Sequence, residues 1–327
     1  MKLTRRKVFA AAAAAALLAQ NAPAFAQAYP QKQITLVVAY PAGGDTDAIA
    51  RAYAEKLTTR LGQPVLVDNR PGASGTVGNA SVARAPADGY TLLFTPSTFP
   101  IAPHVLKKGV GAEHDVIKDF TPVILTGRIP LMLVAHPGAA LRDVKTLVDA
   151  ARGGRKLSYA SPGSGSPMHI VAEMFNKAAN IKITHVPYKG VAPAVNDVLG
   201  GHVELAWITP GAVAQHLATG KLTLVAVAER QRSPLLPNVP TLIESGYKDL
   251  EVSAWFGVLG PKGMSADLVR TLNMAFNEVL KMPDITARMA TLGAYPVGGE
   301  SAVLTRQIEA DDTRFGRIVK ELNIQAD

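Results

Sequence analysis

The feature that most constrains the fold is an alternation of short runs rich in β-branched residues with helical patterning, beginning at residue 33. Strands are predicted at 33–39, 64–67 and 90–95, and helices at 46–61 and 76–85. Such alternation is typical of βαβ units and predicts a mostly parallel sheet.

The pattern then starts again, which predicts a second α/β lobe. Its strands are expected near 131–135, 157–160, 183–186, 203–207 and 222–228, and its helices near 143–152, 166–179 and 193–199. Another apolar strand at 252–259 precedes a helical C-terminal part. The last helix shows an apolar face made by Leu304, Ile308, Phe315, Ile318, Val319 and Leu322.

A single sheet with all of these strands would be unusually wide, so we expect two lobes. Strands near 123–131 and 251–259 connect them, and the C-terminal helices return to the first lobe. The expected organisation is a signal peptide at 1–26, a discontinuous lobe 1 at 27–129 and 252–327, and lobe 2 at 130–251.

The signal peptide is predicted from the order of features at the start of the chain. A basic head with Lys2, Arg5, Arg6 and Lys7 precedes an alanine- and leucine-rich run, and Ala24-Phe25-Ala26 supplies the small-residue exit. The head loosely resembles a twin-arginine signal. Because the apolar run is shorter than the ~20 residues of a membrane anchor, we expect export to the periplasm.

Composition excludes several classes of function. The chain has no cysteine, so neither disulfides nor zinc thiolate sites can form. Removal of residues 1–26 lowers the formal charge from +8 to +4, since that segment has four basic and no acidic residues. The remaining basic residues are scattered among acidic ones, so no nucleic-acid partner is expected.

Three glycine-rich connections, at 40–47, 70–75 and 160–167, each precede a predicted helix. Unpaired N–H groups in the first turn of a helix favour anions, and glycine allows close approach to the backbone. Since ligands of open α/β sheets bind beyond the carboxyl ends of the strands, the first and third loops are expected to face one another across a cleft. The alternative is ordinary turn and cap chemistry, with Ser166 as an N-cap before Pro167.

Catalytic and metal signatures are absent from the sequence. It contains no G-x-S-x-G elbow, no phosphate-binding P-loop and no G-x-G-x-x-G. None of the seven histidines lies three or four residues from another, so neither a metal nor a cofactor is expected. His169, just inside the helix after the third loop, is a candidate ligand donor, a supporting group or polar lining.

The ordered motifs of the mature chain resemble the Bug family, the extracytoplasmic solute receptors of tripartite tricarboxylate transporters. The motifs are Pro41-Ala42-Gly43-Gly44-x-x-Asp47, Asn69-Arg70-Pro71-Gly72-Ala73-x-Gly75-x-x-Gly78, Asp88-Gly89-Tyr90-Thr91-Leu92, Gly163-x-Gly165-Ser166-x-x-His169, His185-Val186-Pro187-Tyr188-Lys189-Gly190, Pro237-x-Val239-Pro240-Thr241 and Trp255-Phe256-Gly257.

This resemblance implies a type II periplasmic-binding-protein fold, in which two α/β lobes joined by hinge strands close on a small carboxylate without catalysis. Main-chain N–H groups and ordered water hold the carboxylate in such proteins. This carries over to Ala42, Gly43 and Gly44 of one lobe and to Ser161, Gly163, Gly165 and Ser166 of the other. The remaining expected ligand-binding residues are Asp47, Ser97, Thr98, His169, Tyr188, Trp207 and Thr209.

Two acidic residues follow the first loop, and position 208 lacks one. We expect Asp47 to bond loop or helix N–H groups, and Asp45 to point to solvent or to a cation. Many members of the family have an acid near Ile208 that suits a ligand ammonium group, so we expect an amino group to be disfavoured. Trp207 would then offer an apolar surface for an aromatic or long-chain acid. The alternatives are that Trp207 and Ile208 are core residues, or that Asp45 turns inward and binds the ammonium group itself.

The function expected is therefore capture of a di- or tricarboxylate or an aromatic acid by a monomeric periplasmic receptor, which delivers it to integral-membrane permease subunits. Two alternatives remain open at this point. A carboxylate-sensing receptor for a membrane sensor would use the same residues, and a secreted enzyme on the same architecture would need a catalytic group that the sequence does not display.

Overall fold

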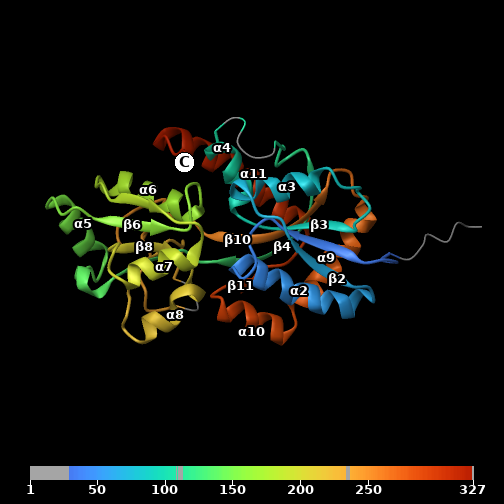
Figure 1. Ribbon diagram of the computed structural model, residues 1–327, viewed down its shortest axis with the longest axis horizontal. Helices are drawn as coiled ribbons and strands as arrows, with labels where there is room; N and C mark the ends of the chain where they lie inside the picture. Colours follow the sequence, from blue (N-terminus) through green and yellow to red (C-terminus); the bar gives the residue numbers. More distant parts are fainter. Residues whose placement is uncertain (1–28, 108, 110–112, 233–235, 326–327) are drawn as a thin grey trace, which may run out of the picture. The chain divides into compact units, whose positions relative to one another are not determined.

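The computed structural model describes residues 29–107, 109, 113–232 and 236–325, so the predicted signal peptide at 1–26 lies outside the described residues. Residues from Lys32 onward form one compact unit. Its described strands form a six-stranded sheet and a five-stranded sheet, each with its own helices (Figure 1).

The six-stranded sheet and the helices packed on it are called lobe 1 here. Its strand order is β11-β4-β10-β3-β1-β2. The strands are β1 (Ile34–Val38), β2 (Val65–Asn69), β3 (Thr91–Pro96), β4 (Phe120–Ile129), β10 (Ala254–Pro261) and β11 (Tyr295–Pro296). The helices are α2 (Asp45–Leu61), the 3₁₀ turn η1 (Ala73–Gly75), α3 (Thr76–Ala83), α4 (Thr98–Val105), α9 (Ala266–Leu280), α10 (Pro283–Thr291) and α11 (Ser301–Leu322).

The five-stranded sheet and its helices are called lobe 2. Its strand order is β7-β6-β8-β5-β9. The strands are β5 (Met132–Ala135), β6 (Ser158–Ser161), β7 (Thr184–Pro187), β8 (Leu205–Ile208) and β9 (Thr223–Val227). The helices are the 3₁₀ turn η2 (Pro137–Ala139), α5 (Val144–Arg152), α6 (Pro167–Ala179), α7 (Val191–Leu199) and α8 (Pro210–Ala218).

Both sheets are mixed, so the prediction of a mostly parallel sheet is wrong. In lobe 1, β1 pairs in parallel with β2 and β3, whereas β10 runs antiparallel to both β3 and β4. In lobe 2, β6 is parallel to β7 and β8, and β5 is antiparallel to β8 and β9. The antiparallel strand β10 enters beside the carboxyl end of β3, where the chain returns from lobe 2.

The core of lobe 1 covers both faces of its sheet. On one face, Leu93 and Trp255 of the sheet pack in one cluster with Val82 of α3 and Leu304 of α11. On the other face, the buried ring of Tyr53 from α2 lies against Phe94 and Phe276, with centroid distances of 6.1 and 5.6 Å. The central strands are therefore buried on both sides, which explains their continuous apolar runs.

The core of lobe 2 has the same two-sided arrangement. Ile208 of β8 packs in a cluster with Val195 of α7 and Val213 of α8. The neighbouring Trp207 points to the opposite face, where its ring meets Phe175 of α6 edge-on at 6.4 Å. Successive residues of a strand face opposite sides, so β8 serves both halves of this core.

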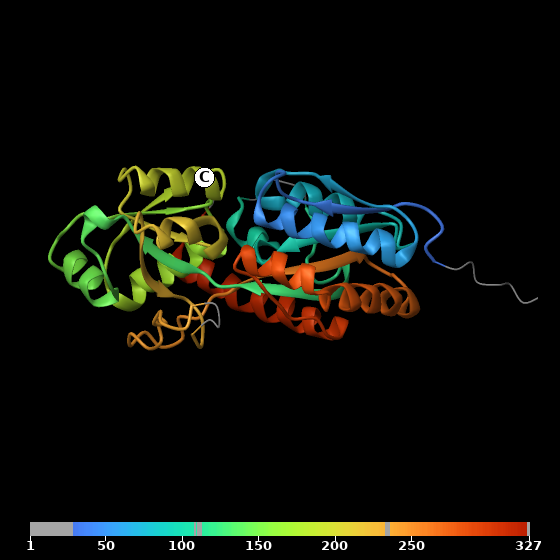
Figure 2. The ribbon, with the colours of Figure 1, turned by 90° about the horizontal axis from the view of Figure 1, so that it is seen from below.

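Two segments connect the lobes, one from β4 to β5 and one from β9 to β10. Backbone hydrogen bonds of 2.9 Å tie them together, since Ala228 N donates to Leu131 O and Val252 N donates to Ala228 O. Both segments can be followed in Figure 2 as the green and orange ribbons that pass between the two sheets. This agrees with the predicted connections near 123–131 and 251–259, while the exact lobe boundaries stay a prediction.

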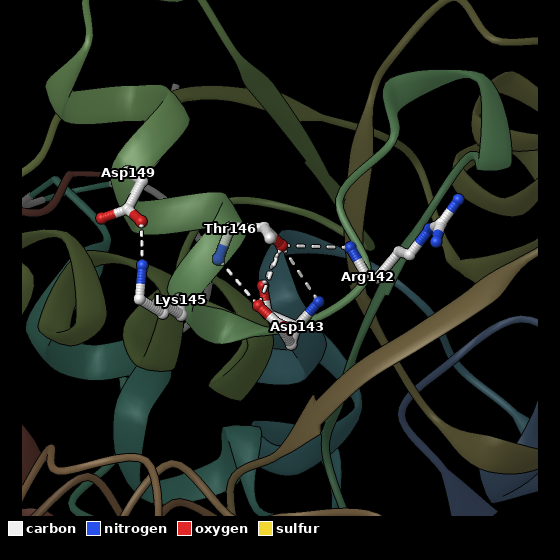
Figure 3. A network of polar contacts seen from close by, with 5 residues as sticks. All are labelled: Arg142, Asp143, Lys145, Thr146 and Asp149. Atoms are coloured by element: carbon white, nitrogen blue, oxygen red, sulfur yellow. Dashed lines mark hydrogen bonds and ion pairs between the residues drawn. The ribbon is translucent and has the colours of Figure 1, made fainter.

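Helix α5 shows how local sequence sets the start of a helix in lobe 2 (Figure 3). The side chain of Asp143 accepts a 2.7 Å bond from Thr146 N, and the Thr146 hydroxyl accepts from Asp143 N in return. This reciprocal capping box satisfies N–H groups that the first turn leaves without helical partners. Lys145 and Asp149, one helical turn apart, form an exposed ion pair with 2.6 Å between Nζ and Oδ2.

Candidate functional site

The first glycine loop joins β1 to α2 and is held in shape by Asp47. Gly43 has φ +89 and its N–H donates to Asp47 Oδ2 at 2.9 Å. Asp47 also accepts bonds of 3.0 Å from Arg51 Nε and Asn69 Nδ2. The prediction that Asp47 bonds loop N–H groups is therefore confirmed, and the Gly43 N–H donates within the protein.

These partners, one cationic and two neutral, stabilise the charge of Asp47. Burial alone would raise its pKa, but the hydrogen bonds from Arg51, Gly43 and Asn69 outweigh burial and hold the pKa below its ordinary value. The carboxylate therefore stays ionised at neutral pH and stabilises the conformation of the first loop. We call this set of hydrogen bonds to Asp47 the loop brace.

The backbone of the first loop is accessible. Ala42, Gly43 and Gly44 are exposed, and a Cβ atom added at either glycine would meet no other atom within 4 Å. Gly44 is the N-cap of α2 and provides no capping side chain. The start of α2 at Gly44 thus lies next to open space, and the N-terminus of a helix favours anions.

Asp45 reaches lobe 2, so the expectation that it points to solvent or to a cation is wrong. Its Oδ2 accepts a 2.9 Å hydrogen bond from Thr209 Oγ1. Thr209 is buried and is the N-cap of α8. Burial raises the pKa of the Asp45 carboxyl, and the Thr209 bond opposes this only in part. The starts of α2 and α8 therefore meet at this bond.

The third glycine loop joins β6 to α6 and is closed by its own hydrogen bonds. Gly163 N donates to Ser161 Oγ at 3.3 Å, and Gly165 N donates to His169 Nδ1 at 3.1 Å. Ser166 caps α6 by accepting from His169 N at 3.3 Å, and its hydroxyl donates to Gly163 O at 2.7 Å. The N–H groups of Gly163 and Gly165 are thus used within the loop, and Ser166 is the N-cap that the sequence predicted.

His169 belongs to a buried stack of rings beneath this loop. Its ring lies on that of His185 at a centroid distance of 3.8 Å, and His185 lies on Tyr159 at 4.9 Å. Ser161 Oγ is 2.6 Å from His185 Nε2. Burial, and secondarily the charge of His185, lower the pKa of His169 to about 3. A neutral His169 whose Nδ1 accepts from Gly165 supports the loop, so the supporting role predicted as one alternative fits its contacts.

Two further predicted residues have hydroxyl groups with partners in their own lobe. Thr98, at the start of α4, bonds the side chain of Tyr40, whose hydroxyl in turn donates to Ser74 O at 3.2 Å. Tyr188 donates to Asp197 Oδ2 at 2.5 Å. Sequence reasoning had not singled out Tyr40, which links the first and second glycine loops.

Ser97 lies at the carboxyl end of β3 and is 1% exposed. Within the described part of the chain, its Oγ has no hydrogen-bond partner. Buried hydroxyl groups are usually satisfied, so this side chain is suited to bond a ligand or a water molecule.

Trp207 and Ile208 are core residues in this structure, with exposures of 2% and 0%. Their side chains point to opposite faces of the lobe 2 sheet, toward Phe175 and toward the α7 and α8 cluster. The apolar ligand surface predicted at Trp207 is therefore not exposed, and the core alternative describes both residues.

His185 is the site residue that sequence reasoning missed most clearly. The parallel register of β6 and β7 sets Tyr159 opposite His185, and Ser161 opposite Pro187. Pairing of the two predicted strands in this register would have placed Tyr159 beside His185, but the third ring, His169, comes from α6. In the described ranges, no group of three or more His, Cys, Asp or Glu side chains could hold a metal ion.

Two α/β lobes, with accessible loops at the carboxyl ends of their strands, define the class of two-lobed solute-binding proteins. The sequence pattern of the tripartite tricarboxylate transporter family receptor, TctC, matches residues 49–324. The chain belongs to this family. Its members are periplasmic substrate-binding receptors rather than enzymes.

Individual relatives agree with this assignment. Protein BugT of Bordetella pertussis is 37% identical over 92% of this chain and 92% of its own length. The structure of R. palustris Rpa4515 with adipate has a TM-score of 0.83 and 33% identity, covering 91% of this chain and 99% of that one. MatC from Rhodopseudomonas palustris with bound malate has a TM-score of 0.78 and 28% identity, covering 89% and 100%. The predicted Bug-family membership and two-lobed fold are confirmed.

Proposed function

We propose that this protein captures a small organic carboxylate in the periplasm for a tripartite tricarboxylate-type transporter. The ligand class is a di- or tricarboxylate or an aromatic acid. The relatives with adipate and malate support this class. The observation that carries the proposal is the bond between Asp45 and Thr209, which brings the starts of α2 and α8 together from the two lobes.

The proposed seat for the ligand carboxylate is the first turn of α2, beside Gly43 and Gly44. The open space at these glycines and the partial positive charge of the helix end support it. Ser97, whose buried hydroxyl lacks a partner among the described residues, is the proposed side-chain donor. Hydrogen bonds to a carboxylate are strong where water is excluded, so few donors are needed.

The proposed mechanism is closure of the two lobes. A ligand that bridges both lobes binds the closed form better, and its binding free energy shifts the equilibrium toward that form. Integral-membrane permease subunits would then recognise the closed receptor, which we propose acts as a monomer. Among the described residues, no helix has the length and apolar character to cross a bilayer.

The test is a thermal-shift screen of purified, ligand-stripped protein against mono-, di- and tricarboxylates and aromatic acids. A ligand at about 100 times its dissociation constant stabilises the native state by about 2.7 kcal/mol, which raises the melting temperature. Calorimetry then gives the affinity. If no carboxylate raises the melting temperature, the proposed function is wrong.

Two outcomes would favour the alternatives. Recovery of a chemically changed ligand after incubation with pure protein would favour an enzyme, and a sensor gene rather than permease genes beside this one would favour signalling. Export is tested by the intact mass of the secreted protein, which we expect to begin at Gln27 after cleavage of the predicted signal peptide.

The sequence predicts that a ligand with an amino group is disfavoured. This prediction assumed that no acid reaches the site once position 208 is an isoleucine. Because Asp45 turns toward Thr209, that assumption no longer holds.

A further inference from the structure

The two acids at the start of α2 lie in opposite electrostatic situations. Asp47 is bound by the guanidinium of Arg51 at 3.0 Å. Asp45 is half-buried, and across the described ranges it forms no ion pair with any Lys, Arg or His. Its side-chain partner is the neutral hydroxyl of Thr209. One carboxylate is neutralised, and the other is left without a compensating cation.

An uncompensated carboxylate at this position discriminates between ligands. It repels a second carboxylate brought close to it and attracts an ammonium group, whose loss of hydration it offsets. Burial also raises the pKa of Asp45, because its charged carboxylate is poorly solvated there. The same poor solvation makes a cationic partner favourable. The loop therefore combines an anion seat on the backbone with an acceptor for a cation one residue away.

No acid of β8 competes for this role. Trp207 and Ile208 are both buried in the lobe 2 core, and the chain then continues with Thr209. The side chain that reaches the end of β8 comes instead from lobe 1, through Asp45.

We propose that Asp45 is a specificity-determining residue, which accepts a hydrogen bond from the ammonium group of a ligand whose carboxylate lies at the first glycine loop. The ligand class that follows is an α-amino acid or another zwitterionic carboxylate. This rests on the proposed function and narrows it, because it reverses the expectation that an amino group is disfavoured. The competing interpretation is that Asp45 and Thr209 only hold the lobes together.

The experiment compares acids that differ only by the amino group. Aspartate and succinate, glutamate and glutarate, and phenylalanine and 3-phenylpropionate are titrated by calorimetry into ligand-stripped protein. In at least one pair, the amino acid is expected to bind about tenfold or more tightly, the factor of one charge-assisted hydrogen bond. Asp45→Asn retains the shape and removes the charge, so it should bring this ratio close to one, chiefly by weakening the binding of the amino acid.

Two further variants separate specificity from structure. Thr209→Val removes the bond to Asp45 but keeps its charge, so the ratio should persist. Asp267→Asn is the matched control, because Asp267 also lies in the first turn of a lobe 1 helix and its side chain is 92% exposed. It should leave every affinity unchanged.

The inference is overturned if every amino acid binds more weakly than its partner, or if Asp45→Asn preserves the preference. It is also overturned if Asp45→Asn and Thr209→Val weaken both members of a pair equally, as a mere contact between lobes would. In all of these cases the carboxylates still bind and the proposed function stands. If no acid of the panel or of the wider screen binds, the proposed function itself fails and the inference falls with it.

Discussion

The hydroxyl of Tyr295 in β11 of lobe 1 donates a 3.1 Å hydrogen bond to Oε1 of Glu229. Glu229 directly follows Ala228, whose backbone N–H bonds Leu131 where the two connecting segments meet. Glu229 is buried, and burial raises its pKa, an effect that the Tyr295 bond and the charge of Arg128 oppose and the charge of Glu251 reinforces. Within the part of the chain that the structure describes, the hydrogen-bond donor to this buried carboxyl group is the Tyr295 hydroxyl of the other lobe.

Replacement of Tyr295 by phenylalanine tests this dependence. Tyr295→Phe should lower the free energy of unfolding by about 1–3 kcal/mol, because it leaves a buried carboxyl group without its donor. A folded-state pKa above the ordinary value makes stability fall as pH rises, and loss of the donor raises that pKa further. The effect should therefore be larger at about pH 8 than at about pH 5 in urea unfolding experiments.

The matched control is Tyr247→Phe. Tyr247 packs edge-on against Phe175 at 5.2 Å, and its hydroxyl forms no hydrogen bond to the described residues. It should change stability by less than about 0.5 kcal/mol. Equal effects of the two variants would contradict the role given to the Tyr295 hydroxyl.

Asp47→Asn should weaken the brace of the first loop. The substitution removes a charge that accepts bonds from Gly43, Arg51 and Asn69, so stability at neutral pH should fall by about 1–3 kcal/mol. The lowered pKa of Asp47 means that its contribution is complete above its ordinary value of 3.8 and is lost as pH falls through the folded-state pKa. The difference between the two proteins should therefore shrink in acid.

Asp68→Asn is the control for this experiment, because Asp68 pairs with Arg70 on the surface, with 43% of its side chain exposed. Exposed pairs contribute about 0–1 kcal/mol, so its loss should be small and measurable by the same urea titration. If Asp68→Asn lowered the free energy of unfolding as much as Asp47→Asn, the hydrogen bonds to Asp47 would contribute no more to stability than an exposed ion pair.

Gly44→Val should reduce ligand affinity with only a small loss of stability. Gly44 has φ −83 and ψ 172, which a branched residue adopts easily, and its side chain would enter open space beside the proposed anion seat. We expect affinity to fall about tenfold or more, while the loss of glycine at this N-cap lowers the free energy of unfolding by only about 0.5–1 kcal/mol. Calorimetry and urea unfolding measure the two quantities.

Graded and strained variants sharpen this result. Gly44→Ala should give a smaller loss of affinity. Gly43→Val and Gly163→Val would also block the approach of a ligand, but φ values of +89 and +148 add backbone strain, so both should lose stability as well. Unchanged affinity in Gly44→Val would place the ligand elsewhere.

His169→Phe should keep the ring stack and remove the acceptor of Gly165. The Gly165 N–H would lose its partner, so stability should fall by about 1–3 kcal/mol at neutral pH. In the native protein the pKa of His169 is lowered from 6.5 to about 3. Between these two pH values the unfolded chain binds a proton that the folded state does not, so the free energy of unfolding decreases as the pH is lowered. The variant should lack this part of the acid sensitivity.

His104→Phe provides the comparison, since His104 is partly exposed and pairs with Asp312 at 2.7 Å. It lies outside the third loop and should leave ligand affinity unchanged, whereas His169→Phe should weaken it. Unfolding as a function of pH, together with calorimetry, distinguishes the two. Identical pH profiles of His169→Phe and the native protein would refute the assignment.

Much of the fold follows from local sequence. The predicted helix at 166–179 is observed at Pro167–Ala179, where Ser166 is the N-cap, and the predicted strand at 203–207 is observed at Leu205–Ile208, a short run of buried apolar residues. Helix α4 was not predicted because its eight residues include two prolines, Pro100 and Pro103. The buried side chains of Phe99 and Ile101 pack it against lobe 1 nonetheless. Helix α8, which begins Pro210-Gly211, was missed for a similar reason.

The site was less predictable because its decisive contacts are distant in sequence. The N-cap role of Ser166 and the brace at Asp47 could be predicted, since their partners lie within a few residues. The orientation of Asp45 could not, because its partner Thr209 is 164 residues away and belongs to another lobe. The burial of Trp207 likewise depends on Phe175, which only the packing of α6 on the sheet brings close.

The two tryptophans of the chain are distributed evenly, with Trp207 in the core of lobe 2 and Trp255 in the core of lobe 1. Trp255 donates from Nε1 to Asp311 at 2.7 Å, whereas the ring of Trp207 packs edge-on against Phe175. Each half of the molecule therefore contains one buried fluorophore with its own neighbours. Emission from Trp207→Phe reports on lobe 1 alone and emission from Trp255→Phe on lobe 2 alone, so the order in which the lobes lose their cores can be followed optically without any attached label.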